Sequence, residues 1–476
     1  MYYMIPRYIF STSRHALQRI TVLYTVVACV LFLLIPHQGV SSEITFSKAL
    51  QIMHANNETI SAALAKKNQS EEKKMAARGL FYPRIGISGR YSRINEPITI
   101  DLNSIRDVIT TLHGLPSSSI PDFELAVQDE DFWQADLTMT WPIFTGGRIL
   151  AANRAADAQV KASEAKVRST ESTLISELAV RYFRLRLARE MVELRRETLD
   201  AMAQHLYKAQ KFEENGMIAK AERLHAEVSY ANADKELKGA IRDVDIALES
   251  LNNILSLQES IEPASPLFIL TTIQPITYFQ GKAQEKNPIL EQIAMQRVMA
   301  HQGYKKEIAS FSPSVYLFGT RKLYTKDLTI LEPEWIAGIG VDLTIFEGFS
   351  RSRQVHAAKF QEQEVMYLEK KMRRDIDTLV STLYQELMKA REQFETLKTS
   401  RISAEEYFRV RNRAFEAGYA TSLDVVDAQL ALSRIKWEQL AAAYKFDVTL
   451  AQLLEASGSS KDLETYIAES DMEVTH

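Results

Sequence analysis

Residues 133–147, WQADLTMTWPIFTGG, and residues 335–349, WIAGIGVDLTIFEGF, decide the fold of this chain. The two stretches are copies of one pattern at a constant offset of 202 residues. In both, apolar residues alternate with small or polar ones, and the alternation leads into Ile-Phe-x-Gly. A period of two predicts a β-strand with one apolar face. The same offset continues as far as Gly216 and Gly418, over about 90 residues, which indicates two copies of one structural unit.

A very long helix follows each strand. Neither glycine nor proline occurs in the 68 residues between Gly147 and Gly216, or in the 69 residues between Gly348 and Gly418. Helix-forming residues fill both intervals, so the sequence predicts helices over 148–215 and 349–417, each ~100 Å long.

The apolar residues of the first long helix form two stripes on nearly opposite faces. One stripe is Leu178, Tyr182, Leu185, Ala188 and Val192, and the other is Val180, Phe183, Leu187, Met191 and Leu194. A two-stranded coiled coil needs only one such seam, whereas this helix needs a neighbour on each flank. A ring of helices around a lumen, a flat helical layer and a spectrin-like bundle all satisfy this demand.

A second strand precedes each strand of the opening pattern. Residues 81–89 resemble residues 311–319 at an offset of 230, so the first copy holds 28 additional residues, within a polar, turn-rich stretch from about 93 to 131. Each unit is therefore predicted to be a helix, a β-hairpin, a very long helix and a shorter helix. The predicted division is a signal peptide at 1–42, repeat 1 at 43–262 (strands near 83–92 and 133–144, helices 148–215 and 219–256), repeat 2 at 263–456 (helix 282–310, strands near 313–322 and 335–346, helices 349–417 and 421–456) and a C-terminal tail at 457–476.

The N-terminus has the composition of a secretory signal. Three arginines precede an apolar run over 20–35, and small residues near Ser42 suit cleavage there. A transmembrane anchor is the alternative, but the run is shorter than the ~20 residues that a spanning helix needs. The only cysteine, Cys29, lies in this segment, and its lipidation stays open because the box before it fits only loosely. Residues 43–476 carry 54 Lys and Arg against 61 Asp and Glu, an acidic balance that argues against nucleic acid as a partner.

Four half-apolar strands cannot cover their own edges. In lipid every backbone group must be paired, so strands span membranes only as closed barrels. Three chains would pool twelve strands, enough to enclose an aqueous pore. Trp133, Trp141 and Trp335 are then candidates for the aromatic rim of the barrel. The alternative is a small soluble sheet that caps a helical bundle.

Three motifs of the chain resemble those of the TolC-type outer-membrane efflux and secretion channels. They are Ala76-Ala77-Arg78-Gly79-Leu80-Phe81-Tyr82-Pro83, Trp141-Pro142-Ile143-Phe144-Thr145-Gly146-Gly147, and residues 415–429, FEAGYATSLDVVDAQ. The resemblance implies an α+β membrane protein of two tandem repeats. It also implies a homotrimer with a 12-stranded barrel in outer-membrane lipid of a Gram-negative bacterium and a helical tunnel in the periplasm. The implied partners are a periplasmic adaptor (membrane-fusion) protein and an inner-membrane transporter.

The same resemblance selects residues at the periplasmic tip. Asp424 and Asp427 match two aspartates that ring the lumen in the family, and Glu222 matches an aspartate of the first repeat. A threefold carboxylate ring would attract cations and would repel itself when unpaired. For Asp424, N-capping of the following helix is an equal alternative. Ala420 stands where the best-known member has a latch arginine, and the sequence gives no such role to Arg223 or Arg413.

Gly216 and Gly418 are expected to supply positive φ angles at the two helix-helix turns. By resemblance, these turns are also where an adaptor hairpin would dock.

Enzymatic function is not expected. The nine histidines have no ligand-like spacing and no nucleophile elbow or phosphate loop occurs, so no catalytic, metal or cofactor site is predicted. The leading hypothesis is an export channel for small toxic molecules or secreted polypeptides. A periplasmic or surface coiled-coil scaffold with no transport role is the alternative, and the sequence does not identify the cargo.

Overall fold

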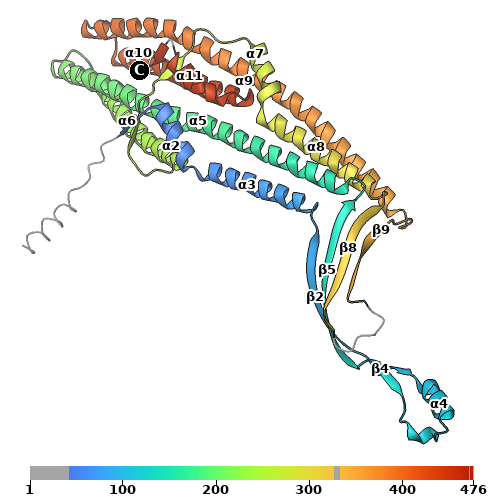
Figure 1. The fold of residues 1–476 in the computed structure, drawn as a ribbon. Helices are drawn as coiled ribbons and strands as arrows, with labels where there is room; N and C mark the ends of the chain where they lie inside the picture. The colour runs from blue at the N-terminus through green and yellow to red at the C-terminus, as the bar shows by residue number, and fades with distance from the viewer. Residues whose placement is uncertain (1–41, 326–332, 471, 475–476) are drawn as a thin grey trace, which may run out of the picture.

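The computed structural model describes residues 42–325, 333–470 and 472–474. A layer of helices forms most of the molecule, and a curved sheet extends from one end of it (Figure 1). The predicted signal peptide lies outside the described residues, apart from Ser42, where the first short strand begins.

The two halves of the chain carry similar successions of elements. The first half contains β1 (Ser42–Ile44), α2 (Phe46–Asn56), α3 (Glu58–Gly79), β2 (Arg84–Arg93), β3 (Ile98–Asp101), α4 (Asn103–Leu112), the 3-10 turn η1 (Ser117–Ser119), β4 (Glu124–Gln128), β5 (Asp131–Phe144), α5 (Arg148–Glu214), α6 (Lys220–Leu255) and β6 (Ile261–Pro263). The second half contains β7 (Leu267–Ile269), α7 (Ile276–Lys286), α8 (Pro288–Ala309), β8 (Ser314–Thr325), β9 (Trp335–Asp342), α9 (Ser350–Glu416), α10 (Ser422–Ala456), the 3-10 turn η2 (Ser460–Asp462), α11 (Leu463–Ala468) and β10 (Met472–Val474).

The main sheet has four antiparallel strands in the order β2-β5-β8-β9. Its register aligns apolar residues across the strands: Ile87 lies opposite Leu137, and Trp141 opposite Leu317, which in turn lies opposite Ile339. In the described part of the chain, β2 and β9 each pair on one side only. The sheet is therefore open at both edges.

The opposite face of the sheet shows why β9 contains glycine. A Cβ atom built on Gly340 would lie 2.4 Å from the ring of Tyr316 on β8, so no larger residue fits beneath that ring. Gly338 accommodates Phe318 in the same way, with a hypothetical Cβ contact of 3.1 Å. These glycines give β9 room for the aromatic rings of β8.

The two long helices occupy different places in the helical layer. Near the sheet α5 lies between α3 and α8, and farther away it contacts α6 and α10. It therefore has the neighbours on both flanks that its two apolar stripes require. The helix α9 contacts α8, α7 and α10, and it buries only 9 residues against 24 for the equally long α5. This difference places α9 at an edge of the layer.

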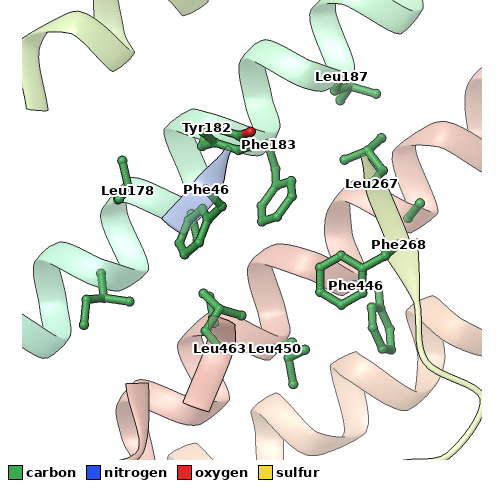
Figure 2. Packing of buried hydrophobic residues seen from close by; sticks show 14 of the residues in the cluster. Phe46, Leu178, Tyr182, Phe183, Leu187, Leu267, Phe268, Phe446, Leu450 and Leu463 are labelled. Carbon is green, nitrogen blue, oxygen red and sulfur yellow. The ribbon is translucent and has the colours of Figure 1, made fainter. Parts of the chain in front are cut away.

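The core lies where the short strands meet the middle of the long helices (Figure 2). There the rings of Phe46, Phe183, Phe268 and Phe446 follow one another at centroid distances of 5.8–6.2 Å. The hydroxyl of buried Tyr182 donates to the carbonyl of Ile44 at 2.7 Å and accepts from the backbone N–H of Ser265 at 2.8 Å. These bonds fasten the chain before α2 and the chain after β6 to the centre of α5.

The helix predicted at 282–310 is in fact two helices. α7 ends at Lys286 and α8 begins at Pro288, while Asn287 between them is extended, with ψ 120°. Proline at 288 disfavours the helical conformation of the residue before it, and the Asn287 side chain caps α8. The prediction of one continuous helix was wrong at this residue.

Three other segments also differ from expectation. The predicted tail at 457–476 contains α11, and its strand β10 pairs with β7. The turn-rich stretch from about 93 to 131 folds into a ribbon, β3 and β4, that carries α4. The strand expected at 335–346 ends at Asp342. None of the helices in the described residues is long and apolar enough to cross a membrane.

Candidate functional site: the turns at the helix tips

Two helix-helix turns end the molecule at the side remote from the sheet (Figure 1). Gly216 has φ 70° and Gly418 has φ 80°, the left-handed conformation expected of them. The N–H of Met217 donates to the carbonyl of Phe212, and that of Tyr419 to the carbonyl of Ala414, each at 2.8 Å. With the bonds made by the glycine N–H groups, both turns are Schellman motifs.

A small apolar cluster joins the four helices just below these turns. Ala209, Ala226, Phe415 and Val425 come from α5, α6, α9 and α10, and all four are buried. The cluster is separate from the main core. The tip is therefore a packed unit of its own, which can loosen without unfolding the rest of the layer.

Glu222 joins one turn to the other. It lies in the first turn of α6, and its carboxylate accepts a 2.7 Å hydrogen bond from the backbone N–H of Ser422, the first residue of α10. An anionic acceptor at a helix N-terminus satisfies a free N–H group and interacts favourably with the helix dipole. Glu222 therefore links the N-terminus of α6 to the N-terminus of α10 through this hydrogen bond.

Sequence reasoning missed His205, which completes this connection. Its Nε2 atom lies 2.7 Å from the hydroxyl oxygen of Ser422, and both residues are buried. The ring also packs against Phe415 with centroids 4.8 Å apart. Burial, helped by the charges of Lys208 and His225, lowers the pKa of His205 from 6.5 to about 4. His205 is thus neutral at ordinary pH, and its contacts suit the neutral ring.

Asp424 caps α10. Its carboxylate accepts hydrogen bonds from the N–H and the hydroxyl of Thr421, at 2.9 and 2.7 Å, while the Thr421 hydroxyl accepts from the Asp424 N–H. This reciprocal pair is a capping box. The bond from the Thr421 backbone, followed by that from its hydroxyl, lowers the pKa of Asp424, and Arg411 contributes from 3.4 Å. The capping alternative considered for Asp424 is what the single chain displays.

Asp427 differs from both other carboxylates. It is exposed, one turn beyond Asp424 on α10, and within the described residues it makes no hydrogen bond or ion pair. Of the three predicted lumen carboxylates, Asp427 alone has neither a hydrogen-bond nor an ion-pair partner among the described residues.

The cation nearest Asp424 is Arg411, which the sequence did not indicate. Arg223, to which the sequence gives no latch role, pairs with Glu213 at 2.6 Å and with Glu227. Ala420 packs against the apolar cluster of the tip. Arg411 lies on α9, nine residues before Ala420, the position at which the best-known member has its latch arginine, and no motif in the sequence identifies it.

The three rim candidates lie on the sheet and are exposed. Trp133 and Trp141 share one face of β5 and lie eight residues apart, which is ~27 Å along a strand. Trp335 begins β9, and the Nε1 atom of Trp141 donates to the carbonyl of Phe81 at 2.9 Å. Among the residues that the structure describes, no three His, Cys, Asp or Glu side chains gather in a way that could hold a metal ion.

Comparison with known proteins identifies the family. The sequence profile described as "Outer membrane efflux protein" matches residues 49–256 and 280–459, most of the chain. The chain belongs to the outer membrane efflux protein family. The TolC-type resemblance read from the motifs is thereby confirmed. This family consists of channels and not of enzymes, and it assigns the chain to the outer membrane, with the helical tunnel in the periplasm.

Individual members of the efflux protein family agree with the profile. The chain is 25% identical, over 352 residues, to the cobalt-zinc-cadmium resistance protein CzcC of Cupriavidus metallidurans, covering 70% of this chain and 81% of that protein. The fold matches the outer membrane protein VceC of Vibrio cholerae with a TM-score of 0.72 at 16% identity, over 87% of this chain and 96% of that one. It matches the open state of the MtrE outer membrane channel of Neisseria gonorrhoeae with a TM-score of 0.70 at 17% identity, over 87% and 89%.

Proposed function

We propose that three copies of this chain form a continuous export channel. Their sheets join into one 12-stranded barrel, and their helical layers join into a tunnel that ends at the tips. The observation that carries the proposal is the open sheet, whose edge strands β2 and β9 lack an outer neighbour in the described chain. Unpaired strand edges in lipid are not tolerated, so another chain must cover them.

The strand directions permit identical copies to join edge to edge. β2 and β8 run away from the helices, whereas β5 and β9 run back toward them. The β9 strand of one copy therefore meets the β2 strand of the next in the antiparallel sense, and the alternation continues around the ring. A closed cyclic assembly of head-to-tail interfaces uses both edges of every copy.

The helical layer has free flanks that match those of the sheet. Val228 and Ile246 on α6 are 61% and 68% exposed, and Phe360 and Ile402 on α9 are 70% and 67% exposed. These helices lie at opposite edges of the layer. Apolar side chains at both edges support the same ring, in which the α9 flank of one copy packs on the α3 and α6 flank of the next.

The sheet itself supports a lipid-facing wall. Ile87 and Ile339 are 73% and 69% exposed on its apolar face. The ~27 Å between Trp133 and Trp141 along the strand become ~21 Å along the membrane normal at a barrel tilt of ~40°, somewhat less than the ~25 Å apolar band that aromatic residues border at both interfaces. We assign Trp141 to the rim nearer the helices and Trp133 to the outer rim, whereas Trp335 at the start of β9 aligns through Arg321 with Leu137, between the two.

The cargo is delivered to the channel by partner proteins. The turns at Gly216 and Gly418 are the outermost points of the helical layer, so a periplasmic adaptor protein bound there would connect the tunnel to an inner-membrane transporter. That transporter supplies the energy, because this chain has no nucleotide-binding motif. The likeness to a cobalt-zinc-cadmium resistance protein makes divalent metal ions a cargo class to test beside small toxic molecules and secreted polypeptides.

Two single substitutions test the barrel against a water-exposed sheet. Ile87→Lys places a charge on the apolar face, where lipid contact costs ~2–4 kcal/mol, whereas Ser88→Lys places the same charge on the opposite face beside Asp136. We expect the parent chain and Ser88→Lys to form trimers by native mass spectrometry and to give single-channel conductance in planar bilayers. Ile87→Lys should insert poorly. Equal insertion of both variants, or a monomer without conductance, would favour the scaffold.

A further inference from the structure

The ribbon between β2 and β5 carries the helix α4, whose polar side is buried and whose apolar side is exposed. On α4 the polar side faces the ribbon: Thr110 is 2% exposed, and the mostly buried guanidinium of Arg106 pairs with Asp107 and Asp122. Asn103 also binds inward, because its side-chain oxygen accepts from the N–H of Phe123 at 2.9 Å. The polar contacts of α4 are therefore satisfied within its own chain.

The outward side of α4 is apolar. Ile105, Val108, Ile109 and Leu112 are 50%, 64%, 43% and 79% exposed. Their spacing of i, i+3, i+4 and i+7 aligns them in one stripe along the helix. A helix that buries its polar side and exposes its apolar side requires a partner for that stripe.

The charge of the ribbon favours a protein partner over the membrane surface. Residues 94–130 contain seven acidic residues and one arginine, a net charge of −6. Helices that lie in the membrane interface typically present basic residues to anionic headgroups, and this segment would be repelled by them. Asp107 lies on the side of α4 away from the stripe and pairs with Arg106, so its charge does not oppose close approach of a second helix to the stripe.

The position of α4 brings copies of the stripe together. The ribbon projects beyond the end of the sheet that is remote from the helices (Figure 1). In a twelve-stranded barrel the mouth at that end is ~24 Å across, from the strand spacing and tilt. Three helices of ~10–11 Å diameter, side by side around a threefold axis, span almost the same width.

We propose that the α4 stripes of three copies pack against one another across the outer mouth of the pore. The proposal rests on the trimeric channel proposed above, and its partner is a second and third copy of this chain. The 28 additional residues of the first hairpin thus form a lid that the shorter second hairpin cannot supply. Each lid is anchored to its own chain by Arg106 and meets its neighbours through the apolar stripe.

Cysteine cross-linking tests the arrangement. In a Cys29→Ser background, Val108→Cys and Leu112→Cys place one thiol on the stripe, whereas Thr111→Cys places it on another side of the same helix, where the native residue is also exposed. With a short three-armed maleimide on the folded protein, we expect covalent trimer to be the main product at 108 and 112. The product at 111 should not exceed background.

The outcomes separate this proposal from the one on which it rests. A trimer by native mass spectrometry that cross-links no better at 108 and 112 than at 111 would overturn the lid and leave the channel intact. Absence of any trimer would refute the channel itself. A fluorophore on Leu112→Cys that brominated lipids quench would place the stripe in the membrane, and this result also overturns the lid.

Discussion

The side-chain amide of Asn287 donates a 2.8 Å hydrogen bond to the carbonyl of Ala456, so the start of α8 is tied to the end of α10. Asn57 makes the equivalent bond to the carbonyl of Ile254, at 3.2 Å, between the start of α3 and the end of α6. Both asparagines also cap the helix that they precede, and both are buried. At each site one side chain satisfies the free N–H groups of one helix and a free carbonyl of another.

Replacing either asparagine should destabilise the middle of the helical layer. Asn287→Ala and Asn57→Ala each lose an N-cap and leave a carbonyl without its donor, which together cost about 1–3 kcal/mol. We expect both variants to unfold at lower temperature by circular dichroism. Asn56→Ala is the matched control, because Asn56 is exposed at the end of α2. An equal melting temperature for all three variants would show that the two bonds contribute nothing.

The lowered pKa of His205 predicts that the tip becomes less stable in acid. Its pKa of about 4 in the folded chain lies below the value of 6.5 for a free imidazole, so the unfolded state binds more protons between these values. The stability that neutral His205 contributes is complete above pH 6.5 and is lost as the pH falls toward 4. The loss is at most about 3 kcal/mol, since one pKa unit corresponds to about 1.4 kcal/mol.

Hydrogen exchange of residues 422–430, corrected for the intrinsic effect of pH, measures this loss. Protection should fall between pH 6.5 and 4 in the parent chain and much less in His205→Gln, which keeps a polar side chain but does not titrate. His356→Gln, a change at an exposed histidine of α9, should behave as the parent does. If His205→Gln loses protection over the same range, another group is responsible.

The three tip carboxylates should contribute unequally to cation block of the pore. Asp427 has no hydrogen-bond or ion-pair partner among the described residues, whereas Asp424 is engaged by Thr421 and Arg411, and Glu222 by the N–H of Ser422. Asp427→Asn removes three charges from a trimeric ring and should raise the multivalent cation concentration for half block by roughly three- to ten-fold. Asp424→Asn and Glu222→Gln should change it less. A larger effect of Asp424→Asn in bilayer recordings would contradict this ranking.

The difference between these residues marks the limit of prediction from sequence. Spacing of glycine and proline located the long helices and the two Schellman turns, because their conformations are set by nearby residues. The contacts of Ser422 with Glu222 and His205 join residues 200 and 217 positions apart, and only the packing of α5, α6 and α10 brings them together. Arg411 is only 13 residues from Asp424, but their contact depends on how α10 folds back on α9 at the Gly418 turn, and no motif specifies that contact.

Two errors of prediction have local causes. The break at Asn287 was present in the sequence as Asn-Pro, but strong helix formers on both sides concealed it. Within residues 93–131, glycine, proline and serine dominate the part after α4, and this composition predicts turns. The helix itself was overlooked because its apolar stripe has no partner within the chain, and an unpaired stripe does not indicate where it packs.

Asp447 should contribute more to the stability of the folded chain in acid than at neutral pH. It is fully buried on α10, one carboxyl oxygen accepts from the N–H of Phe268 at 3.3 Å, and the other has no hydrogen-bond partner among the described residues. Burial raises the pKa of Asp447 well above its usual value. The folded state thus binds an additional proton, and this stabilising contribution, complete below pH ~4, is lost as the pH rises.

Asp447→Asn should therefore raise the free energy of unfolding at neutral pH by about 1–3 kcal/mol, since the amide carries no charge to bury, and the melting temperature should rise with it. The gain should shrink toward pH 4, where the parent carboxyl is already neutral. Asp243→Asn, at an exposed position of α6, should have no effect at either pH. A gain that is the same at pH 4 and pH 7 would mean that packing, and not ionisation, distinguishes the two side chains.

Two glycine-to-alanine substitutions should act in opposite directions. Gly418 has φ 80°, and nothing lies within 4 Å of a Cβ atom added there, so Gly418→Ala meets only backbone strain and should destabilise the tip by about 1–2 kcal/mol. Gly239 lies within α6, is exposed and is equally free of neighbours, so Gly239→Ala should stabilise by about 0.5–1 kcal/mol through helix propensity. Hydrogen exchange at residues 414–421 and 235–243 reports each change locally. A stabilised tip in Gly418→Ala would show that the left-handed turn is not retained in the assembled channel, where an adaptor is proposed to bind.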